Sequence, residues 1–581
     1  MIFPAGLAHA ARRQRDGDDV ERGERASVVG VRLWLLGLVL LFVVGLLPYA
    51  GSFFHHHMDE RFYTNAAITM VQSGDAFTPR WLDGSVALQK PILTYWMTAA
   101  SYALFGINPF TSRIPTMLAG VLIIVLTYRV TLGLTGNRDR AFLAALITFS
   151  QHQLIIASIH SIPDVFLCLF MLVSGWGFLS LIARGRRTPG AYWAAYGSAG
   201  LAVATKGLLA VVFVAFAWLF AWLYRVDARS RPPLRSLLHG PSMLVGAVVA
   251  GWWYAAMTWT HGSLLWRTFV TDQMIEDTEV HGEQLYRIPI YFVLLLVNLL
   301  PWTLAVVELW WRDRRGLAAP DDEERALFWL IVLWSAMVAV ISGFINSEDG
   351  RYLLPVGPLG AIVLAGVIER ADPVARRLAL RHLLALSFAA MVGLGLVLAA
   401  IRVRIGPPMA GIAVLALFAS VITAVALATY RWRWLTLATA VAVMAFVPFP
   451  LTAISLRPVF APDAGVREAA EELARGADPS RPVLFAGGEN AASRVRLASG
   501  GVVHIVRSPV PPDASRATWP DAMVLPVADA ARLDLSGYRT REVTLGIGSI
   551  TLTRLSRLIL AGHAAEMLDR LRERYVVATR H

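Results

Sequence analysis

Ionisable residues gather in one stretch of the chain, directly after its first long apolar run. The stretch opens with "FFHHHMDERFY", which contains an acidic pair, Asp59 and Glu60, followed by Arg61. Arg80 and Lys90 come later in the same stretch. A carboxylate among cations stays ionised and can orient or deprotonate an attacking hydroxyl. The cations can stabilise the charge that develops on a phosphate leaving group. The stretch therefore predicts group transfer from an anionic substrate.

The histidine run in this stretch invites a metal interpretation. His55, His56 and His57 are consecutive, and consecutive side chains on a helix point in different directions, whereas a zinc site needs spaced ligands and a further partner. The single cysteine, Cys168, lies in an apolar run, which excludes an internal disulfide and argues against a thiolate site. We therefore predict no metal and no other cofactor, and we interpret the histidines as groups that solvate a helix end.

The composition indicates a membrane protein. Hydrophobic residues make up 56% of the chain and charged residues only 16%, which is too little charge to cover a soluble protein of this length. The formal net charge of +12 could indicate nucleic-acid binding. However, the arginines form short clusters between apolar runs, as the positive-inside rule predicts for cytoplasmic loops. We therefore expect no nucleic-acid partner.

Apolar runs long enough to cross about 30 Å of hydrocarbon predict thirteen spans. A further run, 91–105, would be only about 22 Å long as a helix, and its tyrosines and tryptophan suit a helix lying at the membrane interface. If this run spanned, the later arginine clusters would all face outward, against the positive-inside rule. The thirteen predicted spans are 32–50, 112–134, 140–157, 163–183, 190–206, 207–225, 240–259, 288–311, 326–345, 352–370, 381–401, 408–429 and 434–454.

Three regions follow from this topology: a cytoplasmic tail (1–31), a transmembrane domain (32–455) and a domain outside the membrane (456–581). In the last region "PVLFAGG", "GVVHIV", "AMVLPV" and "REVTLGIGSITLTRL" have strand patterns. The segment "GHAAEMLDRLRERY" has a helix pattern. The fold class is thus an all-α polytopic membrane protein with a small C-terminal α/β domain. No nucleotide-binding fingerprint is present in that domain.

The same topology places a second set of ionisable residues on the external side. Many of them come from loops far apart in the sequence, which is harder to explain as simple anchoring than one charge alone. The chain has only two lysines, and both are predicted there, where a compact ammonium differs from the planar guanidinium of arginine. The external set comprises Asp59, Glu60, Arg61, Asp75, Arg80, Lys90, Arg113, His160, Asp164, Lys206, the loop 261–287, Glu348, Asp349, Arg351 and Tyr352.

The run "DERFYTNAAITMVQSGDAFTPRWLDGSVALQKPILTYWMTAASYALFG", followed by "SRIPTMLAG", resembles the first external loop of the GT-C fold glycosyltransferases. Within them it is similar to the lipid A aminoarabinose transferase and protein mannosyltransferase-like group. Further matches are Asp164, "TKG" at Thr205, "LLPW" at Leu299 and "RYLLPVGPLG" at Arg351. The resemblance covers roughly residues 30–460.

The resemblance implies transfer of a sugar from a polyprenyl-phosphate carrier to a lipid, glycan or protein acceptor at the external face of a bacterial inner membrane. It implies that Asp59, with Glu60 beside it, is the catalytic carboxylate. It also implies donor-phosphate contacts, and some of the matching positions depart from the family pattern. Gln89 replaces an acidic metal ligand, so zinc is not carried over. The implied phosphate-binding residues are Lys90, Arg61, Arg351 and Tyr352, and the other implied site residues are Tyr63, Arg80, Arg113, Asp164, Lys206 and His281.

Two other functions fit a chain with many spans. A transporter or lipid flippase would place charges near the middle of the bilayer, often in the broken helices of an inverted repeat. The charges here are predicted at one face, and the sequence has no evident repeat, which favours the enzyme. An inactive relative is the third alternative, because a fold does not fix a function.

Overall fold

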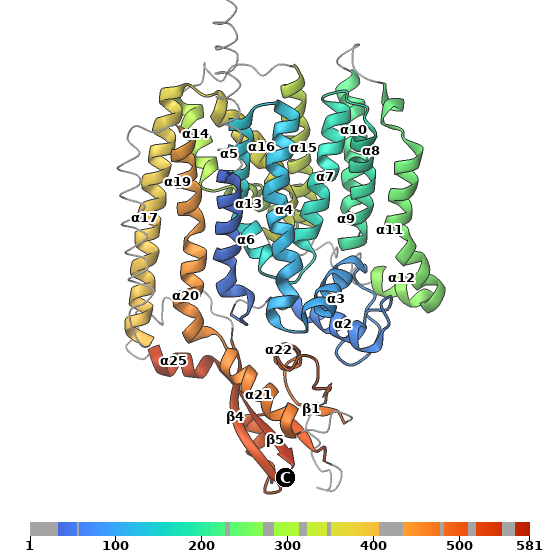
Figure 1. Ribbon diagram of the computed structural model, residues 1–581, viewed down its shortest axis with the longest axis vertical. Coiled ribbons are helices and arrows are strands. Elements are labelled where there is room, and N and C mark those ends of the chain that lie inside the picture. The colour runs from blue at the N-terminus through green and yellow to red at the C-terminus, as the bar shows by residue number, and fades with distance from the viewer. Residues whose placement is uncertain are drawn as a thin grey trace, which may run out of the picture.

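The computed structural model describes most of the chain, and all statements below concern that part. The described residues are 33–54, 57–207, 209–226, 233–270, 284–312, 322–344, 350–405, 434–476, 481–508, 519–548 and 564–580. A bundle of long helices forms the larger part, and a small domain with a β-sheet lies against one end of it (Figure 1). The predicted fold class, a polytopic helical protein with a C-terminal α/β domain, is confirmed. The predicted tail 1–31 lies outside the described residues.

The expected number of thirteen spans is not confirmed. Seven described helices are long and apolar enough to cross a membrane, and two bent helix pairs raise this number to nine at most. Three expected spans are helical but are interrupted, shorter or less apolar: 190–206, 207–225 and 240–259. A π-helical turn, η1, interrupts the first of these three. The expected span 408–429 lies outside the described residues. The seven spans are Leu33–Ala50, Pro109–Thr135, Asp164–Ile182, Arg325–Gly343, Gly350–Arg370, Pro373–Ile401 and Trp434–Phe460.

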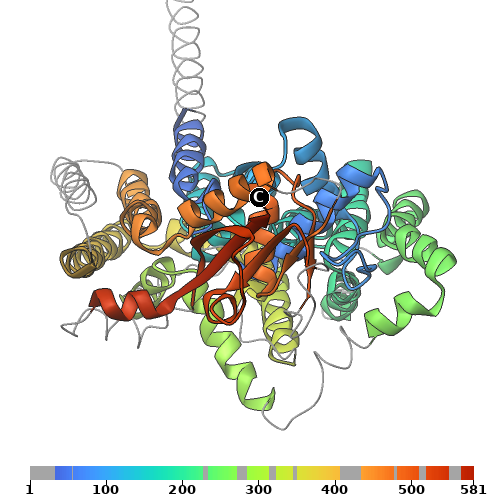
Figure 2. The ribbon, with the colours of Figure 1, turned by 90° about the horizontal axis from the view of Figure 1, so that it is seen from below.

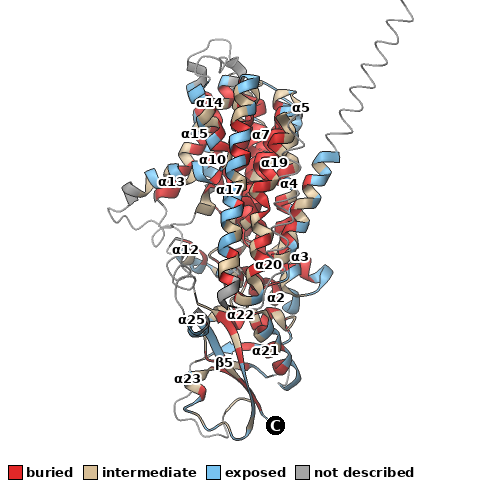
Figure 3. Ribbon diagram, turned by 90° about the vertical axis from the view of Figure 1, so that its left-hand side faces the viewer, coloured by how far each residue is buried: buried red, intermediate tan, exposed pale blue. Residues whose placement is uncertain are grey.

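Buried apolar side chains fill the centre of the bundle, and exposed ones face outward (Figure 3). The outward-facing apolar residues suit contact with lipid tails, as expected of spanning helices. The helices of the bundle after the first one are α4 (Pro109–Thr135), α5 (Arg138–Phe149), α6 (His152–Ser158), α7 (Asp164–Ile182), α8 (Pro189–Tyr192), η1 (Trp193–Gly197), α9 (Ser198–Lys206), α10 (Leu209–Val226), η2 (Leu234–Leu237), α11 (Gly240–His261), α12 (Ser263–Val270), α13 (Gln284–Asn298), α14 (Trp302–Arg312), α15 (Asp322–Phe344), η4 (Gly350–Val356), α16 (Gly357–Arg370), α17 (Pro373–Ile405), α19 (Trp434–Phe446) and α20 (Pro448–Phe460).

The segment after the first span, which the sequence predicts to be the first external loop, forms two short helices, α2 (Glu60–Ser73) and α3 (Leu93–Phe105). Helix α2 ends at Gly74, whose φ of +74° is a left-handed conformation that favours glycine. Both helices lie at the end of the bundle that faces the C-terminal domain (Figure 1). With 13 residues, α3 is too short to span, which agrees with the predicted interfacial helix over 91–105.

The C-terminal domain begins slightly later than expected, because α20 continues through residue 455 to Phe460. Its strands are β1 (Val483–Phe485), β2 (Ile505–Arg507), β3 (Ala522–Pro526), β4 (Tyr538–Ile547) and β5 (Arg572–Arg580), and its helices are α21 (Asp463–Gly476), α22 (Glu489–Ala498), α23 (Val527–Ala530) and α25 (Ala564–Leu571). The sheet order is β2-β1-β3-β5-β4, with β1 parallel to β2 and β3, and β5 antiparallel to β3 and β4. From below, this domain lies across the bundle (Figure 2).

The helix predicted over 562–575 is wrong at its end. Helix α25 stops at Leu571, and residues from Arg572 onward form β5. Tyr575 and Val577 in this strand are buried, and β5 pairs with a neighbour on each side. Because central sheet pairing satisfies both edges of the strand, it overrides the local helix pattern of the charged residues.

Helix α2 and helix α22 join the two domains. Asn65 Nδ2 donates to Ser493 Oγ at 2.7 Å, and Gln72 Nε2 donates to the carbonyl of Gly501 at 2.7 Å. Arg496 Nη2 donates to Thr69 Oγ1 at 3.1 Å. Burial lowers the pKa of this arginine to about 10. These buried and partly buried polar contacts hold the C-terminal domain on the helix that begins beside Asp59.

Candidate active site

Two ion pairs lie at the end of the bundle next to the C-terminal domain. Arg351 Nη1 lies 2.7 Å from Asp59 Oδ2, although the two residues are 292 positions apart. Lys206 Nζ bonds to Asp164 Oδ1. The tertiary fold therefore brings together four residues that the sequence placed on one face but could not pair.

Local structure explains where these charges are. Asp59 precedes α2 as its N-cap, but its carboxylate makes no capping bond and is held by Arg351 instead. Asp164 is the first residue of α7 and Lys206 is the last of α9, so each charge is stabilised by the dipole of its own helix. Helix α9 stops because Gly207 takes a φ of +91°, which is open to glycine and strained for other residues.

Two tyrosines line the same cluster. The ammonium of Lys206 lies 4.3 Å from the ring centroid of Tyr352, and the guanidinium of Arg351 lies 5.7 Å from that centroid. Tyr63, on α2, is fully buried; burial raises the pKa of its hydroxyl well above the ordinary value, and nearby Tyr95 raises it further. Tyr63 therefore keeps its proton and can donate a hydrogen bond in this cluster.

Two histidines join the cluster: His57, which the sequence indicates as a group that solvates a helix end, and His160, which the sequence places only on the external side. His57 Nδ1 lies 3.8 Å from Asp59 Oδ2, and His57 Nε2 lies 3.5 Å from Arg351 Nη1. The rings of His57 and His160 are 5.4 Å apart. The run of three histidines, one residue before the acidic pair, was the available signal for His57. In the part of the chain that the structure describes, no group of three His, Cys, Asp or Glu side chains is arranged to hold a metal ion.

The two carboxylates of the predicted acid pair, Asp59 and Glu60, have different partners in the structure, and the catalytic role of Glu60 stays a prediction. Glu60 is 1% exposed, and its two oxygens lie 3.0 and 2.9 Å from Nε and Nη2 of Arg113. One of these oxygens also accepts the backbone N–H of Ser161 at 2.7 Å. Successive residues on a helix are rotated by about 100°, so Asp59 faces the cluster while Glu60 faces the bundle. Glu60 and Arg113 form a buried structural pair.

Arg61, predicted at the donor phosphate, and Arg80, predicted as a further site residue, both have partners outside the ion-pair cluster, and their roles stay predictions. Arg61 extends to α22, where its Nη1 donates to Asn490 Oδ1 at 2.9 Å and its Nε lies 3.4 Å from Glu489. Arg80 is more than a third exposed and donates to the carbonyl of Gly84, four residues later in its own turn. Arg61 therefore joins the domains, and Arg80 stabilises a turn of the first loop.

Lys90 and His281 remain predicted site residues. Lys90 is half-buried in the segment that leads into α3, and its contact with a donor phosphate stays a prediction. His281 lies outside the described residues, as do Glu348 and Asp349.

The arrangement can hold an anion beside a reachable carboxylate. Arg351 and Lys206 are both mostly buried, where the charge of a cation is screened less than at a surface. The carboxylate of Asp164 is 3% exposed, whereas that of Asp59 is 35% exposed. Asp59 is thus the carboxylate that a substrate can reach, and Asp164 serves to position Lys206.

Several known proteins are similar to this chain in sequence or in fold. A family model described as dolichyl-phosphate-mannose-protein mannosyltransferase matches residues 89–254. An uncharacterized protein of Aquifex aeolicus is 26% identical over 317 residues, which are 54% of this chain and 59% of that protein. The undecaprenyl phosphate-alpha-4-amino-4-deoxy-L-arabinose arabinosyl transferase 2 of Proteus mirabilis is 26% identical over 350 residues, 58% of this chain and 59% of that protein. The matches thus cover less than two thirds of these relatives.

The fold is similar to that of a solved structure over nearly its whole length. The crystal structure of ArnT from Cupriavidus metallidurans bound to undecaprenyl phosphate superposes with a TM-score of 0.67 at 18% identity, covering 93% of this chain and 98% of that chain. At this identity the likeness concerns the fold. The resemblance to the GT-C glycosyltransferases is therefore confirmed by fold and by sequence. This polytopic membrane protein has the ArnT fold, and its sequence is similar to those of the aminoarabinose transferases.

Proposed function

We propose that the chain is a glycosyltransferase that moves a sugar from a polyprenyl-phosphate carrier to an acceptor at the external face of the membrane. The observation that supports this most is the cluster of Asp59, Arg351, Asp164 and Lys206 at one end of the bundle. The relative and the solved structure named above carry undecaprenyl phosphate in their names, and the same carrier is our proposal here.

In the proposed reaction, Arg351 and Lys206 bind the phosphate of the donor. The bond between the anomeric carbon and the phosphate oxygen breaks, and its electron pair stays on the carrier phosphate. The two cations stabilise this leaving group more as its charge grows, so they lower the barrier and do not only tighten binding. The ring of Tyr352 helps to orient Lys206, and the resemblance assigns its hydroxyl to the same phosphate.

Asp59 acts on the acceptor. An acceptor hydroxyl attacks the anomeric carbon, and its proton passes to the Asp59 carboxylate. The donor phosphate must first compete with Asp59 for Arg351, because Asp59 and Arg351 are paired in the free protein. Binding of the donor phosphate to Arg351 would free the carboxylate for the acceptor, which couples donor binding to the activation of the base.

The test is transfer by the purified full-length protein in nanodiscs. Radiolabelled undecaprenyl-phosphate sugars (aminoarabinose, galacturonic acid and mannose) are offered with lipid and glycan acceptors. We expect label on an acceptor and release of undecaprenyl phosphate. Mass spectrometry of envelope lipids, glycans and glycoproteins from a deletion strain identifies the product in the cell.

The transporter alternative is tested in proteoliposomes. If the labelled donor crosses the bilayer without any transfer to an acceptor, the proposal fails and a flippase remains. The two ion pairs of the site, Asp59 with Arg351 and Asp164 with Lys206, lie at one end of the bundle, whereas a transporter would place such charges near its middle.

A further inference from the structure

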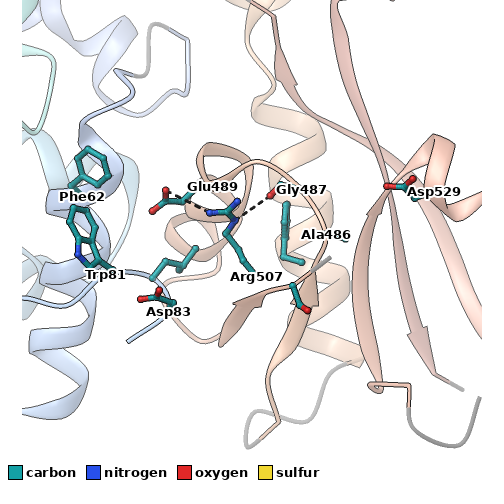
Figure 4. Close-up of a pocket in the computed structure, with 11 residues that line it drawn as sticks. Phe62, Trp81, Asp83, Ala486, Gly487, Glu489, Arg507 and Asp529 are labelled. Carbon is teal, nitrogen blue, oxygen red and sulfur yellow. Dashed lines mark hydrogen bonds and ion pairs between the residues drawn. The ribbon is translucent and has the colours of Figure 1, made fainter. Parts of the chain in front are cut away.

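A cleft of about 920 Å³ separates the first external loop from the C-terminal domain. Phe62 and Trp81 of the loop form one side, and residues that follow the parallel strands form the other (Figure 4). Its lining includes neither Arg351 nor Lys206, so it is distinct from the ion-pair cluster.

The sheet places this cleft at a position typical of ligand sites. Strand β1 lies between β2 and β3 and is parallel to both, so its carboxyl end is a switch point, where connections leave toward opposite sides. Gly487 follows β1, Arg507 ends β2, and Asp529 follows β3 on α23; all three line the cleft. A Cβ atom at Gly487 would lie 2.5 Å from the ring of Tyr575, which is too close. The loop after β1 therefore has no side chain at this position of the cleft.

The loop side of the cleft is aromatic. The rings of Phe62 and Trp81 meet edge to face, with centroids 4.7 Å apart and planes at 81°. The guanidinium of Arg61 packs against the Phe62 ring, 4.4 Å from its centroid. Rigid aromatic faces pack well against the C–H faces of sugar rings, because they offer a large contact area at little entropic cost.

The polar groups of the cleft are mainly carboxylates. Asp83, Glu489 and Asp529 line it together with Arg507, which lies 3.8 Å from Glu489; Arg61, outside the lining, lies 3.4 Å from the same carboxylate. Ser85 holds Asp83 in place, and its hydroxyl lowers the pKa of that carboxyl. Ionised carboxylates accept hydrogen bonds from hydroxyl groups and repel phosphates. The lining therefore suits a neutral polyhydroxy ligand.

The cleft begins close to the proposed base. Phe62 follows Asp59 by three residues on α2, which is about 4.5 Å along the helix axis at 1.5 Å per residue and nearly one full turn. The bonds from Asn65 to α22 and from Gln72 to the loop after it hold α2 against the C-terminal domain, so the cleft keeps a fixed position relative to Asp59.

We propose that this cleft binds the neutral sugar units of a glycan acceptor and holds the acceptor hydroxyl near Asp59. The role as acceptor site rests on the proposed function. Binding of glycans by the cleft does not, and the experiment separates the two.

The full-length protein, labelled and held in nanodiscs, is applied to a glycan array that carries neutral, uronic acid and phosphorylated saccharides. We expect binding to neutral glycans. The Trp81→Ala variant should lose tenfold or more of this binding, and Trp81→Phe should retain most of it. Binding of undecaprenyl phosphate should be the same in all three proteins.

A second variant guards against a folding defect. Asp529→Asn removes a charge on the opposite wall and should weaken glycan binding at an unchanged melting temperature. Its matched control is Glu468→Gln, a half-exposed carboxylate of the same domain that lies outside the cleft. Any of three outcomes would overturn the proposal: the protein binds no neutral glycan, it binds only phosphorylated glycans, or Trp81→Ala and Asp529→Asn bind neutral glycans as well as the unsubstituted protein does. If transfer fails while Trp81-dependent glycan binding persists, only the proposed function falls.

Discussion

Lys206 lies between Asp164 and the ring of Tyr352: its ammonium bonds to the carboxylate and stands 4.3 Å from the ring centroid. The three residues come from α9, α7 and η4. A buried ammonium held from two sides has little freedom to move. The donor phosphate would meet a cation that is already oriented.

The first prediction separates the catalytic role of Lys206 from its structural role. Lys206→Met leaves Asp164 buried and unpaired, and breaking such a pair costs about 3–5 kcal/mol of stability. The double variant Lys206→Met/Asp164→Asn removes both charges and should recover most of the melting temperature. Turnover with the lipid-linked donor should stay low in both. Recovery of turnover in the double variant would show that Lys206 serves only to neutralise Asp164.

The second prediction concerns Asp59. Asp59→Asn keeps the shape and removes the base, so turnover with a hydroxyl acceptor should fall by roughly 10²–10⁴. Donor binding should stay the same or become tighter, because Arg351 is released. Single-turnover rates and undecaprenyl-phosphate binding are measured on purified protein, with Asp75→Asn in the same loop as the control. If the acceptor is itself a phosphate, already ionised, the loss of turnover will be much smaller. Loss of donor binding in Asp59→Asn would contradict the assignment.

The third prediction concerns Glu60. Because both of its oxygens bond to Arg113, Glu60→Gln should lower the free energy of unfolding by about 3–5 kcal/mol. The exposed pair of Arg475 and Glu471 is the control, and Glu471→Gln should change stability by under about 1 kcal/mol. Thermal unfolding of the purified variants gives both values. If the Glu60→Gln protein instead has normal stability but no turnover, the result would support the predicted catalytic role of Glu60 beside Asp59.

The fourth prediction concerns metals. We propose that transfer needs none, since two cations already face the donor phosphate, so activity should survive prolonged dialysis against a strong chelator. The measurement is the transfer rate before and after dialysis, with total metal determined by mass spectrometry. Loss of activity that one divalent ion restores would identify a metal site, and His57 with His160 would be the first side chains to substitute.

The sequence by itself determined the class of protein and predicted which charged residues share one end of the bundle. Long apolar runs require helices in a membrane, because backbone groups there must bond within their own segment. The arginine clusters then predicted which ends of the helices share a face, and that prediction grouped Asp59, Asp164, Lys206 and Arg351, which the structure brings together. Turn and strand patterns also located most of the C-terminal domain.

Only the tertiary structure decided which of these charges act together. Asp59 and Glu60 are neighbours in sequence, yet one helical step of about 100° directs the first to Arg351 and the second to Arg113. Arg61 contacts α22, which is more than 400 positions away, a partner that no local pattern specifies. Strand β5 exists because two neighbouring strands pair with a segment that locally favours a helix. Pairing, facing and burial depend on contacts between distant segments, and these exist only once the chain has packed.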